Sequence, residues 1–379
     1  MTPNLSTIKQ INRENVLAYI YNQKTTTQKT IKDTLNLSRS TIIQILKEFE
    51  EQNLITKCGQ SESTGGRRAT NISFARYNKI AIGVELLAKR YEIVALDLYG
   101  ETLKCERYHT PYKNDSKYYE TVCQSINNLI LSLTLNKNKI LGVGIVLQGL
   151  ISTDGKKVTY GKILNCTGLT IDVFTKHLDY PCQFYHDAEA ATMDELWQSP
   201  NIQNAIYINI RSNVSGAIIV NRKSLTGTEL KSGVFEHMTI VPNGNLCYCG
   251  NKGCLNTYCS VNALLRQGET LESFFNNLRD GDMEIRDRWN NYLNYLAIAI
   301  NNLHMFMDCT IILGGTIARY FQGSDLKLLH KLIHDNTAFP TQREFIRLTC
   351  CSNSPISRGA ALPYIKNYLY SILGSDTYL

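Results

Sequence analysis

Residues 237–254 read HMTIVPNGNLCYCGNKGC and place one histidine and three cysteines within eighteen positions. These four side chains are His237, Cys247, Cys249 and Cys254. Thiolates and an imidazole at this density suit tetrahedral Zn²⁺, and four protein ligands leave no open coordination position for a reacting water. The spacing therefore predicts a zinc site that is structural and not hydrolytic.

The alternative for this stretch is four buried residues without a metal. Gly244, Gly250 and Gly253 flank the cysteines, and glycines let a short loop turn several sulfurs toward one point. Three cysteines seldom gather in a small polar loop for another reason, so the pattern favours the metal. Cys259 follows nearby, and we expect it to be a buried thiol and not a fifth ligand.

Length and composition indicate a protein with more than one hydrophobic core. The chain has 379 residues, of which 43% are hydrophobic and 19% are charged. The longest strongly apolar run, residues 140–151, is far shorter than the ~20 residues that a membrane span needs. The N-terminus has no apolar signal segment, so we expect a cytoplasmic protein without a membrane partner. Its twelve cysteines are then thiols or metal ligands and not disulfides.

The positive charge of the chain is concentrated at its N-terminus. The formal net charge is +7, and residues 1–80 alone contain twelve basic and six acidic side chains. The remaining three quarters of the chain is close to neutral. This asymmetry favours an N-terminal segment that faces a polyanion.

Apolar periodicity in the first fifty residues predicts three helices. Residues 12–23 form one pattern, and residues 25–55 give a second helix, a short turn and a third helix. Thr27 and Ser38 are expected to cap the second and third helices. The third helix should bury Ile42, Ile45, Leu46 and Phe49. Short polar side chains near its start suit base reading by a helix-turn-helix. The predicted DNA-facing residues are Ser38, Arg39, Ser40, Thr41, Gln44 and Lys47.

Two short strands follow, Leu54–Lys57 and Thr70–Phe74, around the stretch STGGRR. A hairpin after the recognition helix makes a winged helix. Gly65 and Gly66 allow close approach to a duplex, and Arg67 and Arg68 suit phosphates or a narrow minor groove. The alternative is an ordinary helical hairpin with solvated charges, but the local basic excess favours DNA binding. We expect residues 1–77 to form a winged helix-turn-helix domain.

From residue 78 to residue 379 the pattern alternates between strands and helices, which predicts an α/β architecture in two lobes. Strands are expected within residues 79–87, 91–101, 141–150, 204–210, 216–221 and 309–315. Helices are expected at residues 118–133, 289–306 and 359–373.

The chain resembles the ROK family, which contains repressors, uncharacterised open reading frames and sugar kinases. The most specific part is the frame C-x-C-G-x-x-G-C-L within HMTIVPNGNLCYCGNKGCLNTYCS, and further support comes from STGGRR, GIVLQGLIS, LNCTGLTIDV, HDAEAATMDE and ILGG. The resemblance covers essentially the whole chain. It implies a two-lobed actin-like ATPase fold, in which the zinc loop orders one wall of a sugar cleft between the lobes.

The resemblance also implies where ATP would bind in a kinase of this family. Its kinases hold the phosphates in an Asp-x-Gly-Gly-Thr turn and in a loop of sequence Gly-Thr-Gly-x-Gly-Ala-Gly, where backbone amides form an anion-binding nest. The matching stretches here read ELLAKR, residues 85–90, and RSNVSGA, residues 211–217. Because phosphoryl transfer depends on positioning and charge neutralisation, loss of both glycine loops predicts an inactive kinase domain.

On the sugar side the resemblance is partial. Asp187 matches the catalytic base that also grips a sugar hydroxyl, Asn165 matches a sugar-contacting asparagine, and His237 matches a residue shared by zinc and sugar. His186, Val234 and Asn256 stand where kinases have an asparagine and two glutamates. The predicted sugar-binding residues are Asn165, His186, Asp187, His237 and Asn256. Alternatively, Asp187 is a helix cap and His186 is structural.

These observations predict a DNA-binding transcriptional regulator, in particular a repressor of carbohydrate genes, whose inactive kinase-like body senses a sugar or sugar derivative. It would bind a palindromic double-stranded DNA operator as a homodimer or homotetramer. Two other readings stay open. One is a ROK sugar kinase that uses ATP. The other is a DNA-binding regulator without a small-molecule effector, which the two missing carboxylates would permit.

Overall fold

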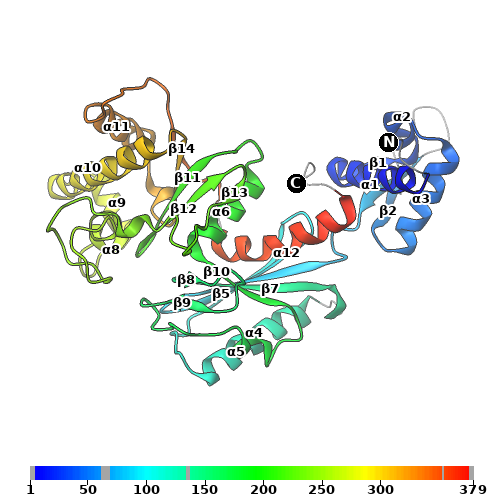
Figure 1. Cartoon of the computed structure of the whole chain (residues 1–379), viewed down its shortest axis with the longest axis horizontal. Helices are drawn as coiled ribbons and strands as arrows, with labels where there is room; N and C mark the ends of the chain where they lie inside the picture. The colour runs from blue at the N-terminus through cyan, green and yellow to red at the C-terminus, as the bar shows by residue number, and fades with distance from the viewer. Residues whose placement is uncertain (1–4, 61–68, 134–136, 352–353, 375–379) are drawn as a thin grey trace.

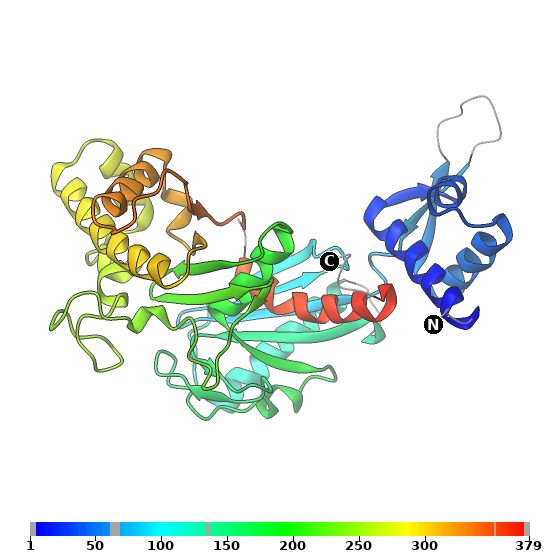
Figure 2. The ribbon, with the colours of Figure 1, turned by 45° about the horizontal axis from the view of Figure 1, so that its top comes forward.

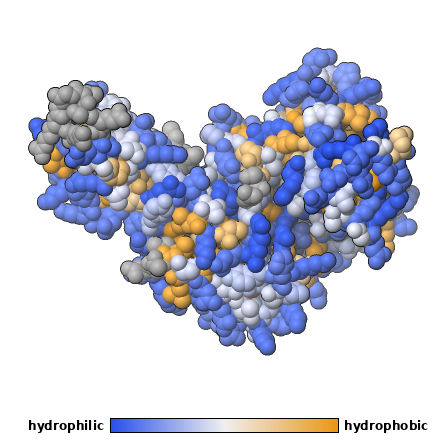
Figure 3. Space-filling model, turned by 180° about the vertical axis from the view of Figure 1, so that it is seen from behind, coloured by the Kyte–Doolittle hydropathy of each residue, from blue (hydrophilic) through white to orange (hydrophobic). Residues whose placement is uncertain are grey.

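The computed structural model describes residues 5–60, 69–133, 137–351 and 354–374. An N-terminal segment, blue in the ribbon views, projects from a larger body (Figures 1 and 2). Hydrophilic residues cover most of the segment on the face seen from behind (Figure 3). The body contains two five-stranded sheets.

The N-terminal segment packs three helices on a small sheet. Its elements are α1 (Leu5–Gln23), β1 (Thr25–Thr27), α2 (Gln28–Leu35), α3 (Arg39–Glu51), β2 (Ile55–Gln60) and β3 (Thr70–Phe74). As predicted, the Thr27 side chain accepts from the Thr30 amide at 3.2 Å and the Ser38 side chain from the Thr41 amide at 3.1 Å. The expected apolar face of α3 is buried.

The small sheet differs from the prediction in two respects. β1 was not expected, and β2 extends to Gln60. β1 pairs antiparallel with β3, so the sheet order is β1-β3-β2. A three-residue strand of threonines has no apolar alternation of its own and forms because β3 offers it a free edge.

The first sheet of the body has the order β10-β7-β4-β5-β6. Its strands are β4 (Ile80–Leu86), β5 (Tyr91–Leu96), β6 (Thr102–Tyr108), β7 (Ile140–Leu147) and β10 (Cys182–His186). β4, β5 and β6 are antiparallel neighbours, whereas β7 and β10 run parallel to β4 and to each other. The predicted strand 91–101 ends at Leu96, because Asp97 Oδ1 accepts from the Tyr99 and Glu101 amides and turns the chain into β6.

The second sheet repeats this plan in the order β13-β12-β11-β14-β15. Its strands are β11 (Ala205–Ile210), β12 (Val214–Val220), β13 (Lys223–Ser224), β14 (Thr310–Gly314) and β15 (Ile346–Leu348). A separate small sheet pairs β8 (Leu150–Ile151) with β9 (Val158–Tyr160). Both large sheets have a hydrophobic core on the side away from the centre of the molecule, the first under α4 and the second under α10.

The helices of the body cover these sheets and form the outer part of the second lobe. They are α4 (Ser116–Ser132), η1 (Lys137–Lys139), α5 (Asp172–Thr175), α6 (Asp187–Gln198), η2 (Phe235–His237), α7 (Asn256–Cys259), α8 (Val261–Leu264), α9 (Leu271–Arg279), α10 (Met283–Phe306), η3 (Ala318–Tyr320), α11 (Gly323–His334) and α12 (Pro355–Leu373). No helix of the described ranges has both the length and the apolar character that crossing a bilayer would require.

Helix α12 lies at the centre of the body (Figure 1). Its backbone comes so close to its neighbours that a β-carbon at Gly83 of β4 would overlap the carbonyl of Ser357. In the same way, Gly144 of β7 faces the Ala360 carbonyl, and Gly359 of α12 itself faces α6. Glycine permits such backbone approach because it has no side chain.

The N-terminal segment is attached to the body by tyrosines and by a shared core. Tyr21 stacks on Tyr99 with ring centroids 4.7 Å apart. The Tyr21 hydroxyl donates to the Leu98 carbonyl and the Tyr99 hydroxyl to the Tyr21 carbonyl, both at 3.1 Å. One cluster of buried residues contains Leu17 of α1 together with Leu369 of α12. The segment is therefore in direct contact with the last helix of the body.

The packing of α12 predicts a cost for any side chain at Gly83. We expect Gly83→Ala to lower the free energy of unfolding by about 2 kcal/mol, in the range of overpacked cores. The measurement is the midpoint of urea unfolding followed by circular dichroism. Gly323→Ala is the matched control, because Gly323 begins α11 with open space around its β-carbon position and without positive φ. Equal midpoints for the two variants would contradict the close packing.

Candidate functional site

A cavity of about 430 Å³ lies between the end of the first sheet and the start of β12. Its lining includes Gln148, Tyr160, Lys162, His186, Asp187, Lys231, Val234, Glu236, His237 and Tyr248. Three of the five predicted sugar-binding residues, His186, Asp187 and His237, are thus brought together on its wall. A concave site with a few convergent polar groups suits a small-molecule ligand.

Asp187 stands where β10 ends and α6 begins. Its Oδ1 accepts from the Ala188 amide at 2.8 Å and lies 3.3 Å from His186 Nε2. Its Oδ2 is buried and has no hydrogen-bond partner among the described residues. A buried acceptor without a partner is costly, so this oxygen marks Asp187 as a candidate ligand-binding residue.

Glu236 is a second carboxyl on the cavity wall, and the sequence did not single it out. It lies in η2 and is buried, and its Oε2 also has no partner in the described parts of the chain. Burial, with the nearby Asp187 charge, raises the pKa of Glu236 to about 8. The family resemblance implied a glutamate at the position that Val234 occupies here. Glu236 supplies a carboxyl group two residues later in the chain. Its position next to His237 in the sequence is the signal that could have identified it as a cavity residue.

Asn165 and Asn256 do not line this cavity. Asn165 is exposed, and its backbone carbonyl accepts from Asn114 Nδ2 at 2.9 Å. The Asn256 Oδ1 accepts from the Val214 amide at 2.7 Å and so holds the start of β12. Both residues make hydrogen bonds within the protein at these positions. Their assignment as sugar ligands stays a prediction, because neither lines this cavity.

The four predicted metal ligands come together beside the same cavity. One ligand atom from each of His237, Cys247, Cys249 and Cys254 lies within 4.8 Å of the others. Cys249 Sγ and Cys254 Sγ are 3.8 Å apart, and Cys247 Sγ is 3.7 Å from His237 Nδ1. Sulfurs bound at ~2.3 Å to one tetrahedral ion would be about 3.8 Å apart. The donor set and its spacing therefore fit a metal ion.

The loop reaches this arrangement through its glycines, as predicted. Gly250 and Gly253 have positive φ values of 100° and 80°. A β-carbon at Gly253 would also overlap the Val241 carbonyl. Cys259 is fully buried in the core of the second lobe and does not belong to the cluster. His237 belongs both to the cluster and to the cavity wall, so the cysteine loop directly shapes the cavity.

A second cavity, of about 440 Å³, lies between the two lobes. Glu85 at the end of β4 and Arg211 after β11 form an ion pair across it, and both side chains are largely buried. These two residues begin the stretches ELLAKR and RSNVSGA. Burial alone would lower the pKa of Arg211, but the Glu85 carboxylate raises it. A direct contact thus joins the two stretches that resemble phosphate loops.

The predicted DNA-facing residues lie on one side of α3. Arg39, Ser40, Gln44 and Lys47 are exposed, Thr41 is half-buried, and Ser38 uses its hydroxyl as the helix cap. Ile43 is exposed on this helix as well. Gly65, Gly66, Arg67 and Arg68 lie outside the described residues.

Comparisons with known proteins give the following relatives. The xylose repressor of Bacillus spizizenii is 25% identical over 320 residues, which cover 82% of this chain and 83% of that protein. The crystal structure of a ROK family transcriptional regulator, a homologue of the Escherichia coli MLC protein, covers 97% of this chain and 98% of its own with TM-score 0.74 and 21% identity.

A kinase of similar fold also matches. The ROK family glucokinase from Streptomyces griseus, in complex with glucose and AMPPNP, superimposes with TM-score 0.66 and 19% identity over 75% of this chain and 98% of that one. These structural likenesses show the two-lobed actin-like α/β fold of the ROK proteins. The sequence model of the ROK family matches residues 81–334, well over half of the chain. The chain therefore belongs to the ROK family.

Proposed function

We propose that the chain is a DNA-binding transcriptional regulator, and in particular a repressor, of genes for sugar metabolism. Residues 1–77 act as a winged helix-turn-helix domain, and residues 78–379 act as a sugar-sensing body without kinase activity. The observation that carries the proposal is the buried Glu85–Arg211 ion pair across the lobe cavity, combined with an exposed polar face on α3. The regulators among the relatives support the same reading.

DNA binding rests on the N-terminal segment. The segment projects from the body (Figure 2), so α3 can enter a major groove without a clash from the lobes. Its first turn presents Arg39 and Ser40, and Gln44 follows one turn later on the same face. Recognition helices of this kind read bases with residues near their N-terminus. A single helix covers few base pairs, so the protein acts on a palindromic operator as a homodimer or homotetramer. We place this activity in the cytoplasm.

The absence of kinase activity is proposed from charge. A nucleotide triphosphate needs cationic groups and free amides around its phosphates. Here the Arg211 guanidinium is neutralised by Glu85, and the tight turn after β4 is closed by a bond from the Leu87 amide to the Arg90 carbonyl at 2.9 Å. Binding of phosphates would have to break a buried ion pair, which is strongly unfavourable when one partner is left alone.

Sugar sensing rests on the first cavity. Asp187 Oδ2 and Glu236 Oε2 are two carboxyl oxygens without partners in the described ranges, and both belong to residues that line this cavity. Sugar hydroxyls satisfy such acceptors. A zinc ion at the four-ligand cluster is structural: its ligands fix His237 and the loop that carries Tyr248 over the cavity.

The elements between the cavity and the N-terminal segment are continuous. Asp187 is the first residue of α6, α6 packs against α12 at Gly359, and α12 contacts α1. A sugar that binds one lobe arrangement better than the other would shift the population between them. Through α12 this shift would change how two N-terminal segments of an oligomer are spaced on DNA.

The DNA-binding role predicts a selective effect of α3 substitutions. A duplex site is first selected from a random DNA pool with the full-length protein, and affinity is then measured by fluorescence anisotropy. We expect Arg39→Ala and Gln44→Ala each to weaken binding by about tenfold or more, since a base contact contributes ~1–3 kcal/mol. The exposed Arg286→Ala on α10 is the control and should bind like the wild type. Unchanged affinity in both α3 variants would refute the assignment of this face.

The wing gives a different signature. Arg67→Ala combined with Arg68→Ala should weaken binding to all DNA sequences alike. It should also make the slope of log K for DNA binding against log salt concentration less steep, by the amount that about two phosphate contacts contribute. An unchanged salt slope would exclude these arginines as phosphate ligands.

The sensing role predicts a thermal shift with a neutral sugar and none with ATP. A panel of pentoses, hexoses, amino sugars and sugar phosphates is screened against the zinc-loaded protein, because a ligand at 100 times its Kd stabilises by ~2.7 kcal/mol. Asp187→Asn should abolish the shift, whereas Asp308→Asn, at an exposed carboxylate of the second lobe, should retain it. A shift with ATP together with sugar phosphorylation would support a kinase instead. No response to any sugar would favour a regulator without an effector.

The metal assignment predicts about one tightly bound zinc per chain after purification without added metal. Cys254→Ser should lose this zinc and melt at a lower temperature, because three ligands cannot hold the loop as four do. Cys259→Ser changes a buried thiol outside the cluster and should keep the zinc. Elemental analysis and thermal melts measure both, and equal zinc contents in the two variants would contradict the assignment.

A further inference from the structure

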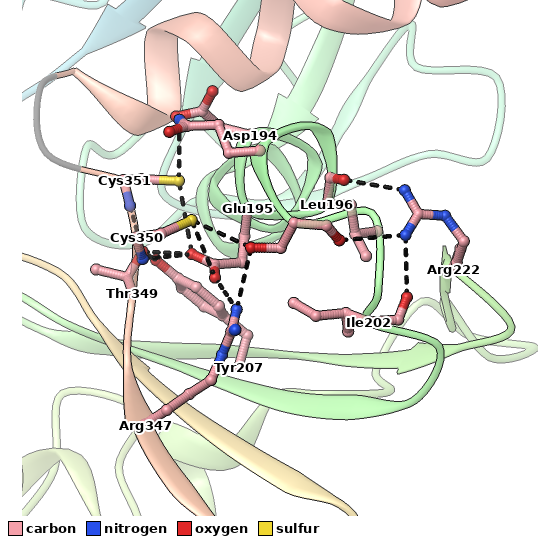
Figure 4. Close-up of polar contacts among 12 residues, drawn as sticks. Asp194, Glu195, Leu196, Ile202, Tyr207, Arg222, Arg347, Thr349, Cys350 and Cys351 are labelled. Carbon is pink, nitrogen blue, oxygen red and sulfur yellow. Dashed lines mark hydrogen bonds and ion pairs between the residues drawn. The ribbon is translucent and has the colours of Figure 1, made fainter. Parts of the chain in front are cut away.

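Two adjacent cysteines and a buried carboxylate meet where β15 leads toward α12 (Figure 4). Cys350 and Cys351 follow Leu348 at the end of β15, and Glu195 lies in the last turn of α6. The two sulfurs and a carboxylate oxygen lie within 4.8 Å of one another. This cluster is distinct from the four-ligand cluster around His237 and uses none of its residues.

Both thiols point at the same carboxylate. Cys350 Sγ donates to Glu195 Oε1 at 3.4 Å, and Cys351 Sγ donates to Glu195 Oε2 at 3.5 Å. The Glu195 side chain has no exposed surface. Two thiols, the exposed Cys350 and the buried Cys351, therefore converge on one buried carboxyl group.

Other groups fix the Glu195 carboxylate in place. Arg347 forms an ion pair with it, Thr349 Oγ1 donates at 2.5 Å, and the Cys350 amide donates at 3.2 Å. Figure 4 shows these groups converging on Glu195 from the β15 side. Outer hydrogen-bond partners of this kind orient a carboxylate ligand.

We propose that Cys350, Cys351 and Glu195 form a second metal site, for a thiophilic divalent cation such as Zn²⁺. On binding, the cation replaces the two S–H protons: M²⁺ and two thiols give one bis-thiolate complex and two protons released to solvent. The net charge of the cluster does not change in this exchange. The Arg347 ion pair therefore remains balanced with the metal in place.

The cavity between the lobes provides access. Cys350 and Cys351 both line it, together with Thr349. An ion can enter from this side, and a water from the cavity can complete the tetrahedron that three protein ligands leave open. With three ligands in place of four, this site exchanges its ion more readily than the cluster at His237.

A disulfide between the two cysteines is the main alternative use of such a pair. Neighbouring Cα atoms are ~3.8 Å apart, whereas a relaxed disulfide needs ~4.4–6.8 Å. Both sulfurs also point toward Glu195, an orientation that suits a metal ion bound by all three residues and not a disulfide bond between the cysteines. The geometry therefore favours metal binding.

The bound ion would connect α6 to the segment that leads into α12. Gln198 Nε2 donates to Cys351 Sγ at 3.4 Å and Ser199 Oγ lies 3.3 Å from Cys350 Sγ, so the end of α6 already contacts both thiols. A metal would replace these weak contacts with coordinate bonds. Its expected effect is a higher melting temperature.

The first test needs no variant. The zinc-loaded protein is alkylated with iodoacetamide at rising free Zn²⁺, and each cysteine-containing peptide is quantified by mass spectrometry. At ten times the Kd of the new site, alkylation of Cys350 should slow about tenfold. Cys58 is also an exposed thiol but lies on β2, away from any cluster, and should react at an unchanged rate. Equal rates at Cys350 with and without zinc, or a recovered Cys350–Cys351 disulfide in the freshly purified protein, would overturn the proposal.

The second test counts ions and protons. Calorimetric titration of Zn²⁺ in buffers of different ionisation enthalpy should show one additional site per chain that releases about two protons. Cys350→Ser should remove this site and leave the zinc at the His237 cluster, while Cys58→Ser should keep both. Glu195→Gln retains both thiols and should weaken the additional site at least tenfold. An additional site that persists unchanged in Cys350→Ser would also overturn the proposal.

Discussion

The backbone of α12 lies directly against β4, β7 and α6, and this contact determines the rest of the body. Gly83, Gly144 and Gly359 make it possible, because any side chain there would occupy the space of a backbone carbonyl. A closely packed interior has few empty volumes, so neighbouring elements cannot shift independently of one another. Helix α12 thus contacts α6 through Gly359 and also contacts α1, so it joins the body to the N-terminal segment.

The two cavities of the body differ in electrostatics. Four arginines line the lobe cavity, and two of them form ion pairs, Arg211 with Glu85 and Arg107 with Glu92. The cavity beside the cysteine loop contains carboxyl oxygens that are not paired within the described chain, at Asp187 and Glu236. The Glu85–Arg211 ion pair stabilises the observed arrangement of the lobes, whereas a buried oxygen without a hydrogen-bond partner is costly. The two cavities of this two-lobed fold thus differ in how their charged groups are paired.

Much of the local structure could be predicted. The polar caps Thr27 and Ser38, the buried face of α3 and the central strands β4, β5, β7, β11, β12 and β14 follow from short-range patterns, because caps and periodic burial depend on neighbouring residues. The outer strands β6, β10, β13 and β15 were not predicted. The four-ligand cluster was also predictable, since its ligands lie within eighteen positions and three of them within eight. By contrast, β1 depends on a partner strand more than forty residues away. Glu195 and Cys350 lie more than 150 residues apart, and no spacing rule connects them.

By itself the sequence determined the helical N-terminal segment, the α/β body and the loop that carries the four candidate metal ligands. Each of these features depends on residues close together in the sequence, because neighbouring side chains determine the local conformation and the type of ligand atom. Only the tertiary structure decided that Glu236 supplies the cavity with a second carboxyl, that Asn165 and Asn256 lie away from its wall, and that Glu85 meets Arg211. Each of these depends on which distant backbone segments approach one another, and that is decided by the packing of the whole core around α12.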